Sequence, residues 1–173
     1  QWSESGMSSS YKFIQKFWSM SIDIINLCKN ENSNELNKEI EIFTNRSLEK
    51  INVSLEKFRY NVIIAVFHEI FNFYSKISEK KQNYKNLKDN FEKILIIINP
   101  VIPHLSRECL AQLSSKSSLN WPSVKKEYLE TDKKEIVIQI NGKKRGNLDI
   151  EKNMKENDIL EKIKKMSLSE KYI

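Results

Sequence analysis

Residues 2–18 read WSESGMSSSYKFIQKFW, and this stretch sets the pattern for most of the chain. Hydroxyl groups at residues 8–10 can accept hydrogen bonds from the free N–H groups of a first helical turn, so a helix is predicted to begin at these three serines. From there apolar residues recur at three- and four-residue steps: Phe13, Phe17, Met20, Ile24 and Leu27. The pattern predicts a long amphipathic helix with one broad buried face.

The opposite face of this helix carries Lys12 and Lys16. Both fall within the first two turns of the predicted helix, where the helix dipole disfavours cations by roughly 0.3–1 kcal/mol each. They are either ordinary lysines of a solvated face or contacts for a polyanion. Periodicity favours neither interpretation.

Composition limits the class of protein. The chain has 173 residues and a formal net charge of +6, which suits a nucleic-acid partner. However, Lys, Asn and Ile are used throughout and acids are interspersed with the cations, as an AT-rich coding sequence would produce. Two cysteines and two histidines, widely separated, predict neither a disulfide framework nor a metal site. With no signal peptide or membrane span in the pattern, we expect a cytoplasmic protein without membrane contact, and the missing initiator Met suggests a fragment.

Four further helices are predicted. Asn32 and Glu35 form a capping box for a second helix, whose buried face is traced by Leu36, Ile40, Phe43, Ser47, Ile51 and Leu55. Asn61 caps a third helix over 62–78 that is apolar almost all round, so Phe67 and Phe71 are predicted core residues. A fourth helix runs from Tyr84 to Ile98, and a fifth from His104 to Leu113. The fold class is therefore mainly α, an antiparallel bundle of about five helices.

The end of the chain changes period. Residues 136–140 alternate as a strand with one buried face, and Asn141-Gly142 is a strong signal for a two-residue hairpin turn. Asn153 with Glu156 predicts a cap for a last helix. We predict a bundle domain over 1–122, a linker over 123–133, and a small, truncated α/β lobe over 134–173. Trp121-Pro122 is predicted to anchor the chain before the linker.

No catalytic constellation is found in the sequence. Three glycines are too few for a Gly-rich phosphate loop of the usual kind, and His68 and His104 are interpreted as surface or capping residues. The stretch 165–169, KMSLS, resembles a class I synthetase signature but ends a short helix and is interpreted as chance. Lys143, Lys144 and Arg145 put three cations after the hairpin turn, either to protect a strand edge or to contact phosphate or nucleobase.

Five motifs in order resemble the bacterial leucyl-tRNA synthetases. The first is the Trp-Ser-Glu-Ser-Gly to Phe-Trp stretch, with Lys12 and Lys16 where that family tends to have Arg and Ser9 where it has Gly. The others are the stretches 58–65 (FRYNVIIA), 99–104 (NPVIPH) and 121–122 (WP), and 137–146, VIQINGKKRG, which is similar to the Val-Val-Gln-Val-Asn-Gly-Lys-x-Arg-Gly of the family's C-terminal domain. The helical motifs are partly shared with the isoleucyl, valyl and methionyl enzymes, whereas the hairpin is more specific to the leucyl enzymes.

The resemblance implies a function for the chain. It implies the C-terminal, tRNA-binding portion of a leucyl-tRNA synthetase, which positions tRNA(Leu) for leucylation by a catalytic core absent from this chain. ATP and Mg²⁺ would serve the whole enzyme, and no catalytic, cofactor or metal residue is expected in these residues. The expected tRNA contacts are Lys12, Lys16, Lys143, Lys144 and Arg145. The alternatives are the equivalent domain of another class I synthetase, or a non-enzymatic helical scaffold for protein interactions.

Overall fold

The computed structural model describes residues 3–29, 35–113, 120–129, 133–140, 143–151, 154 and 156–164. The chain divides into two compact units, residues 1–129 and 130–173. This division falls inside the stretch predicted as a linker, and the predicted limits of the two domains stay a prediction.

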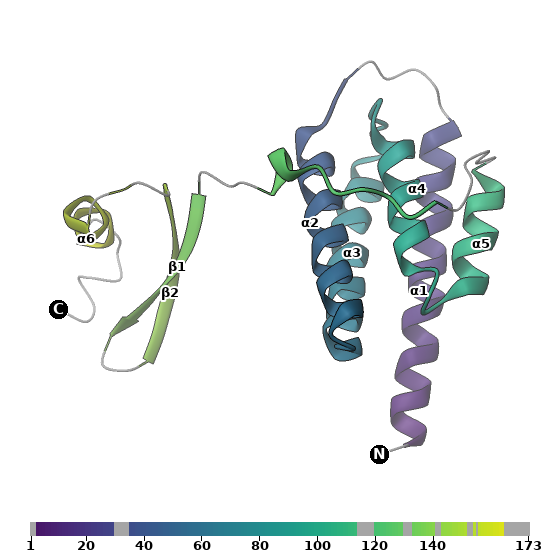
Figure 1. The fold of residues 1–173 in the computed structure, drawn as a ribbon, viewed down its shortest axis with the longest axis horizontal. Helices are drawn as coiled ribbons and strands as arrows, with labels where there is room; N and C mark the ends of the chain where they lie inside the picture. Colours follow the sequence, from purple (N-terminus) through teal and green to yellow (C-terminus); the bar gives the residue numbers. More distant parts are fainter. Residues whose placement is uncertain are drawn as a thin grey trace. The chain divides into compact units, whose positions relative to one another are not determined.

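The first unit is an antiparallel bundle of five helices, as predicted (Figure 1). They are α1 (Glu4–Lys29), α2 (Lys38–Glu56), α3 (Tyr60–Lys80), α4 (Leu87–Ile98) and α5 (Pro103–Gln112). Helix α1 packs against α3, α4 and α5, and α2 packs against α3 and α4. Pro103 stands in the first turn of α5, where its missing N–H leaves no hydrogen bond unmade.

The core of the bundle follows the predicted periodicity. Phe17 and Ile24 of α1, Ile40 and Ile51 of α2, and Phe67 of α3 are all at most 1% exposed. Helix α4 contributes its whole C-terminal run, residues 94–98, to the core. Five amphipathic helices thus bury one shared apolar interior, which is the main stabilising contribution to such a fold.

The first four helices begin at positions that differ from the predictions, and α4 begins at Leu87 rather than at Tyr84. Helix α1 begins at Glu4 rather than at the serines 8–10, because Ser3 Oγ accepts a hydrogen bond from the Gly6 N–H (3.1 Å) and caps the helix. A Cβ at Gly6 would stand 3.0 Å from that hydroxyl oxygen, so glycine lets the cap approach closely. The hydroxyls of Ser9 and Ser10 instead donate to carbonyls four residues back, inside the helix.

Helices α2 and α3 show the same kind of difference. Asn37 caps α2 by accepting from the Glu39 N–H (2.9 Å), so the predicted capping box is wrong at Glu35; its other member, residue 32, lies outside the described residues. Leu36 precedes the helix and is 67% exposed, not buried. Helix α3 begins at Tyr60 after Arg59, which makes no side-chain cap, so the predicted Asn61 cap is wrong.

Helix α3 is less enclosed than its composition predicts. Val62 and Ile64 near its start are exposed, and Phe71 is only partly buried, where a core position was predicted. The reason is that α1 and α2 cover α3 along one side, so residues of its first two turns that point elsewhere meet solvent. Phe67 is core as predicted.

A polar cluster joins the starts of α2 and α4. The Asn86 side chain accepts from the Asn37 N–H (3.1 Å) and donates to the Asn37 carbonyl (2.9 Å). The fully buried Asn90 amide donates to the Glu41 carboxylate (2.8 Å) and to the Asn86 carbonyl (2.7 Å). These bonds fix the register of the two helices, because a buried donor left without a partner costs about 1–3 kcal/mol.

The segment after α5 returns along the bundle. Trp121 Nε1 donates to Asn52 Oδ1 of α2 (2.8 Å), which confirms the predicted anchor. The Lys125 N–H donates to Asn45 Oδ1 (2.8 Å), and a 3₁₀ turn, η1 (Lys126–Tyr128), follows against α2. The first residues of the predicted linker therefore lie on the bundle.

The second unit contains an antiparallel hairpin and a helix: β1 (Lys133–Ile140), β2 (Lys143–Glu151) and α6 (Glu156–Lys164). Ile138 and Ile150 are buried and Ile136 and Leu148 half-buried, whereas Val137 is 51% exposed, so the predicted alternation of the strand is confirmed. The predicted turn residues 141–142, the predicted cap at 153 and the stretch 165–169 lie outside the described residues.

Candidate nucleic-acid interface

The first pair of predicted contacts lies on α1. Lys12 and Lys16 are exposed and stand one helical turn, about 6 Å of axial rise, apart on α1. Because α1 begins at Glu4, they stand in its third and fourth turns rather than in its first two. The dipole effect fades beyond the first turn, so the penalty expected from the sequence does not apply.

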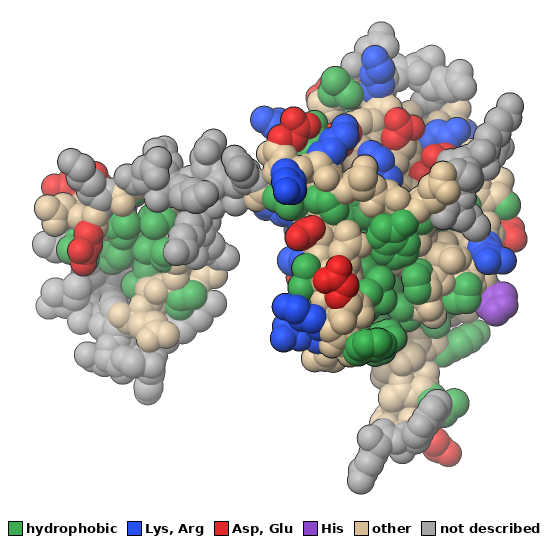
Figure 2. All heavy atoms as spheres, in the orientation of Figure 1, with side chains coloured by type: hydrophobic (Ala, Val, Ile, Leu, Met, Phe, Trp, Pro, Cys, Tyr) green, Lys and Arg blue, Asp and Glu red, His purple; other side chains and the backbone are tan. Residues whose placement is uncertain are grey.

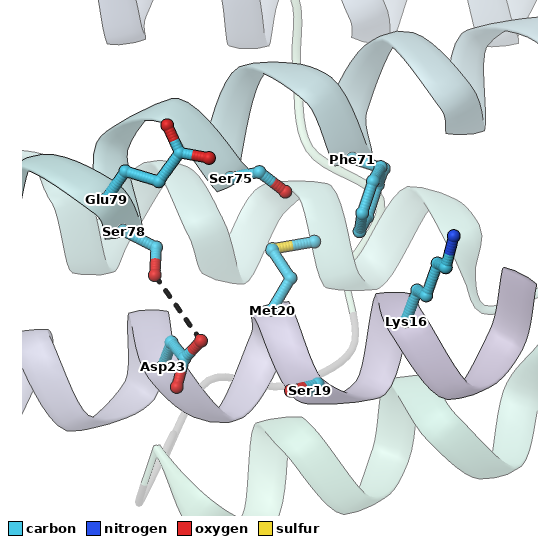
Figure 3. A pocket seen from close by; sticks show the side chains of 8 residues that line it. All are labelled: Lys16, Ser19, Met20, Asp23, Phe71, Ser75, Ser78 and Glu79. Atoms are coloured by element: carbon cyan, nitrogen blue, oxygen red, sulfur yellow. Dashed lines mark hydrogen bonds between the residues drawn. The ribbon is translucent and has the colours of Figure 1, made fainter.

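Lys16 stands at one end of a shallow groove between α1 and α3, shown in Figure 3. Ser19, Met20 and Phe71 form its middle. At its other end lie two carboxylates, Asp23 and Glu79, and the Ser78 hydroxyl donates to Asp23 (3.4 Å). Seven residues of helix, about 10 Å, separate Lys16 from Asp23. The cationic end of the groove is thus the one toward Lys12, and its far end would repel a phosphate.

The second group of predicted contacts lies on strand β2. Lys143 pairs with Ile140 and Lys144 with Gln139, which leaves two residues for the turn. The register then shifts between Ile138 and Gln139, so that Gly146 pairs with Ile138 and Arg145 has no partner across the ladder. A bulge of this kind bends a strand and changes the direction of the residues beside it. The sequence did not predict this bulge.

The two groups of cations belong to different compact units. The structure brings Lys12 and Lys16 together on one helix face, and it places Lys143, Lys144 and Arg145 consecutively along one strand. On α1, two cations one turn apart could contact neighbouring phosphates of a nucleic-acid backbone.

One surface could not be found from the sequence pattern used above. Most of the exposed large hydrophobic side chains of the bundle belong to the start of α1, the end of α2 and the start of α3, and we call them together the apolar end: Met7, Tyr11, Ile14, Phe58, Tyr60, Val62 and Ile64. Of these, Ile14 and Ile64 line one pocket. Figure 2 shows hydrophobic side chains at the surface around this end, beside the projecting start of α1. The spacing of Met7, Tyr11 and Ile14 on one helix face was the available signal, and it was missed because the helix was predicted to begin too late.

The two histidines and the two cysteines all stand on helices of the bundle. His68 is exposed and its ring packs at a tilt of 37° against the Phe13 ring (centroids 4.1 Å apart), and His104 is exposed at the start of α5. Burial raises the pKa of the Cys28 thiol to about 12 and that of Cys109 to about 11, so both are protonated at neutral pH. Within the described ranges, no three His, Cys, Asp or Glu side chains cluster as metal ligands, and no helix is long and apolar enough to cross a membrane.

A family model described as the anticodon-binding domain of tRNA ligase matches residues 37–162. Among curated relatives, the leucine–tRNA ligase of Fusobacterium nucleatum is 30% identical over 171 residues, covering 90% of this chain and 20% of the relative. That of Rickettsia bellii is 31% identical over 163 residues, covering 92% of this chain and 19% of the relative. The chain thus spans about a fifth of the length of these relatives.

A solved structure shares the fold. The Agrobacterium radiobacter K84 agnB2 LeuRS in a ternary complex with tRNA and LeuAMS aligns with a TM-score of 0.71 at 19% identity, covering 99% of this chain and 23% of that one. The match spans the helical bundle and the hairpin unit together.

Proposed function

The chain belongs to the family of anticodon-binding domains of tRNA ligases, and from that premise we propose that it is the tRNA-binding C-terminal portion of a leucyl-tRNA synthetase. The observation that carries this proposal is the similarity to leucine–tRNA ligases over 90% or more of the chain. The leucine–tRNA ligase of Orientia tsutsugamushi, 30% identical, aligns with the whole chain.

The proposed role is to hold tRNA(Leu) while another part of the same polypeptide performs the chemistry. The catalytic core would lie within the remaining four-fifths of the ligase, and ATP and Mg²⁺ would bind there. The substrate would be leucine, coupled to the tRNA through an aminoacyl-adenylate, and the enzyme would work in the cytoplasm. The chain would then raise the rate of aminoacylation only by positioning the acceptor end of the tRNA, since a correctly held acceptor end reacts faster than a free one.

The proposed tRNA contacts are Lys12 and Lys16 on α1 and residues 143–145 on β2. Support comes from the exposure of Lys12 and Lys16 on one face, and from the absence of acidic residues between 143 and 148. Cations that neutralise phosphates release counterions, so each contact steepens the salt dependence of binding. The competing role for residues 143–145 is to keep a strand edge from pairing with another chain.

The experiment is a binding competition between tRNA transcripts. The purified chain is titrated with labelled tRNA(Leu), and unlabelled tRNAs for leucine, isoleucine, valine and methionine compete for it. We expect tRNA(Leu) to compete best. A stronger competitor among the other three would assign the chain to that synthetase instead, and equal competition by an unrelated duplex RNA would favour the scaffold alternative.

A matched pair of variants tests the contacts on α1. Lys12→Gln with Lys16→Gln should weaken binding and flatten its salt dependence. Lys76→Gln with Lys80→Gln removes the same charge from α3 and should change binding much less. If both pairs of substitutions weaken binding equally, the loss of affinity comes from net charge and not from a local contact. Lys12 and Lys16 would then not be part of the tRNA interface.

A further inference from the structure

Four buried oxygen atoms between α2, α3 and α4 have no hydrogen-bond partner among the described residues. They are Glu41 Oε2 and Thr44 Oγ1 of α2, Tyr74 Oη of α3 and Asn90 Oδ1 of α4. The side chains of Thr44, Tyr74 and Asn90 are fully buried. A buried polar atom without a partner is costly, and in native proteins such an atom usually contacts an ordered water or an ion. The four oxygens therefore indicate a binding site for a small polar species.

The four side chains are neighbours. The Asn90 amide donates to Glu41 Oε1 (2.8 Å), so the second oxygen of Glu41 and the amide oxygen of Asn90 belong to the two groups that meet there. Thr44 follows Glu41 by three residues on α2 and so lies on the same side of that helix. Burial raises the pKa of the Tyr74 phenol, the Thr44 hydroxyl lowers it and the Glu41 carboxylate raises it, so Tyr74 is close to both. Three helices thus contribute oxygen atoms to one buried region.

Glu41 brings a negative charge to this region. Its carboxylate accepts hydrogen bonds from the side-chain amides of Asn86 (3.3 Å) and Asn90 (2.8 Å), which are neutral. In the described part of the chain no lysine, arginine or histidine forms an ion pair with it. The raised pKa of the Tyr74 phenol keeps that group neutral at pH 7. Because a buried carboxylate without a cation is destabilising, one positive charge beside Glu41 Oε2 would stabilise the bundle.

The chemistry of the four groups selects the kind of ion. One carboxylate, one amide and two hydroxyls offer only oxygen, which suits hard cations rather than zinc or copper. Mg²⁺ keeps several of its waters and Ca²⁺ takes about six to eight oxygens, so a buried site with a single carboxylate matches a single positive charge. We propose that Glu41, Thr44, Tyr74 and Asn90 bind one alkali-metal cation, Na⁺ or K⁺, inside the bundle. The ion joins α2, α3 and α4, and it stabilises the folded chain by mass action.

The test is urea unfolding of the whole chain in about 100 mM NaCl, KCl or choline chloride, followed by tryptophan fluorescence in a buffer without other alkali ions. Choline keeps the ionic strength constant and is too large for a buried site. An ion that binds only the folded chain lowers the unfolding constant by the factor 1 + [ion]/Kd, which is about tenfold for a Kd of about 10 mM. We expect this decrease in NaCl or in KCl, and the salt with the larger effect identifies the ion. Equal unfolding constants in all three salts would overturn the inference, since water or rearranged hydrogen bonds would then satisfy the four oxygens.

Two variants locate the ion. Tyr74→Phe deletes one oxygen ligand without changing the charge, and Glu41→Gln removes the carboxylate. Each should reduce the difference between the alkali salt and choline chloride to about twofold or less. Glu39→Gln is the matched control, because it removes the same charge from an exposed position in the first turn of α2, and it should keep the tenfold difference. If both variants keep the difference, or if the control loses it, the cations act elsewhere on the chain and the inference is wrong.

Tyr74→Phe also distinguishes the ion from an ordinary hydrogen bond. In choline chloride, deletion of an unpartnered buried hydroxyl should leave the unfolding constant unchanged or lower it, whereas in the alkali salt the deletion should raise it about fivefold. An equal increase in all three salts would mean that the hydroxyl has a protein partner, which also contradicts the inference. Circular dichroism checks that the variants fold. If Glu41→Gln does not fold, the wild-type comparison and Tyr74→Phe decide, because neither removes a charge. None of the four residues is a proposed tRNA contact, so a negative result leaves the proposed function intact.

Discussion

Replacing Phe67 and Phe71 separately by alanine tests how α3 is placed in the bundle. Phe67 is 1% exposed in the shared core, so Phe67→Ala removes a fully buried ring and leaves a cavity, at a cost of about 3–5 kcal/mol. Phe71 is only partly buried and lines the open groove beside Lys16 and Met20. Water can fill the space that Phe71→Ala leaves, so the cost reduces to a partial transfer term of about 1–2 kcal/mol.

Tryptophan fluorescence during urea unfolding measures this difference in the bundle alone, because all three tryptophans precede residue 129. With a slope of about 2 kcal/mol per molar urea, Phe67→Ala should lower the midpoint by roughly 2 M and Phe71→Ala by roughly 0.5–1 M. Circular dichroism before the titration checks that both variants are folded. A cost below about 1 kcal/mol for Phe67→Ala, or equal costs for the two variants, would refute the placement of α3.

Three further outcomes are expected. Asn90→Asp should cost about 3 kcal/mol at pH 7, because the introduced carboxyl can no longer donate the two hydrogen bonds of the amide and lies beside Glu41. Burial raises the pKa of that carboxyl, so the cost should shrink as the pH falls toward about 4, and a cost that grows in acid would contradict the geometry. In a double-mutant cycle, Trp121→Phe and Asn52→Ala should couple by about 0.5–1 kcal/mol in the free energy of unfolding, whereas additive effects would show that the bond contributes nothing. Burial raises the pKa of the Cys109 thiol to about 11, so little of the reactive thiolate is present at pH 8. Maleimide labelling of Cys109 at pH 8, followed by peptide mapping, should therefore be at least about 100-fold slower in the native chain than in urea. Equal rates would mean that the thiol is accessible.

Periodicity predicted the bundle well because burial imposes it directly. Phe17 and Ile24 lie inside because their seven-residue spacing matches two helical turns, and the alternation at 136–138 likewise matches a half-buried strand. Helix starts were predicted poorly because several residues compete to cap. Ser3 caps α1 although three later serines looked equally suitable, since a serine inside a helix can bond back to its own preceding turn.

The cationic residues of the candidate site could be predicted from the sequence, but the backbone geometry that positions those of the hairpin could not. The cations at Lys12 and Lys16 could be assigned to one face, because helical spacing fixes that relation. The bulge that leaves Arg145 unpaired in the ladder could not be predicted, since a one-residue shift in register depends on packing across both strands. The exposed apolar residues at the start of α1 were missed because the helix was predicted to begin at residues 8–10, after Met7.

The most direct test of the proposed tRNA interface is a salt titration of tRNA(Leu) binding by the wild-type chain and by the triple variant Lys143→Gln, Lys144→Gln, Arg145→Gln. A control triple, Lys76→Gln, Lys80→Gln, Lys85→Gln, removes the same charge from the bundle. We predict weaker binding by the hairpin variant, while the control stays close to wild type. The slope of log K against log salt should flatten by about 0.7–0.9 for each phosphate that the hairpin no longer neutralises. Equal affinities and parallel slopes for wild type and the hairpin variant would contradict the proposed interface.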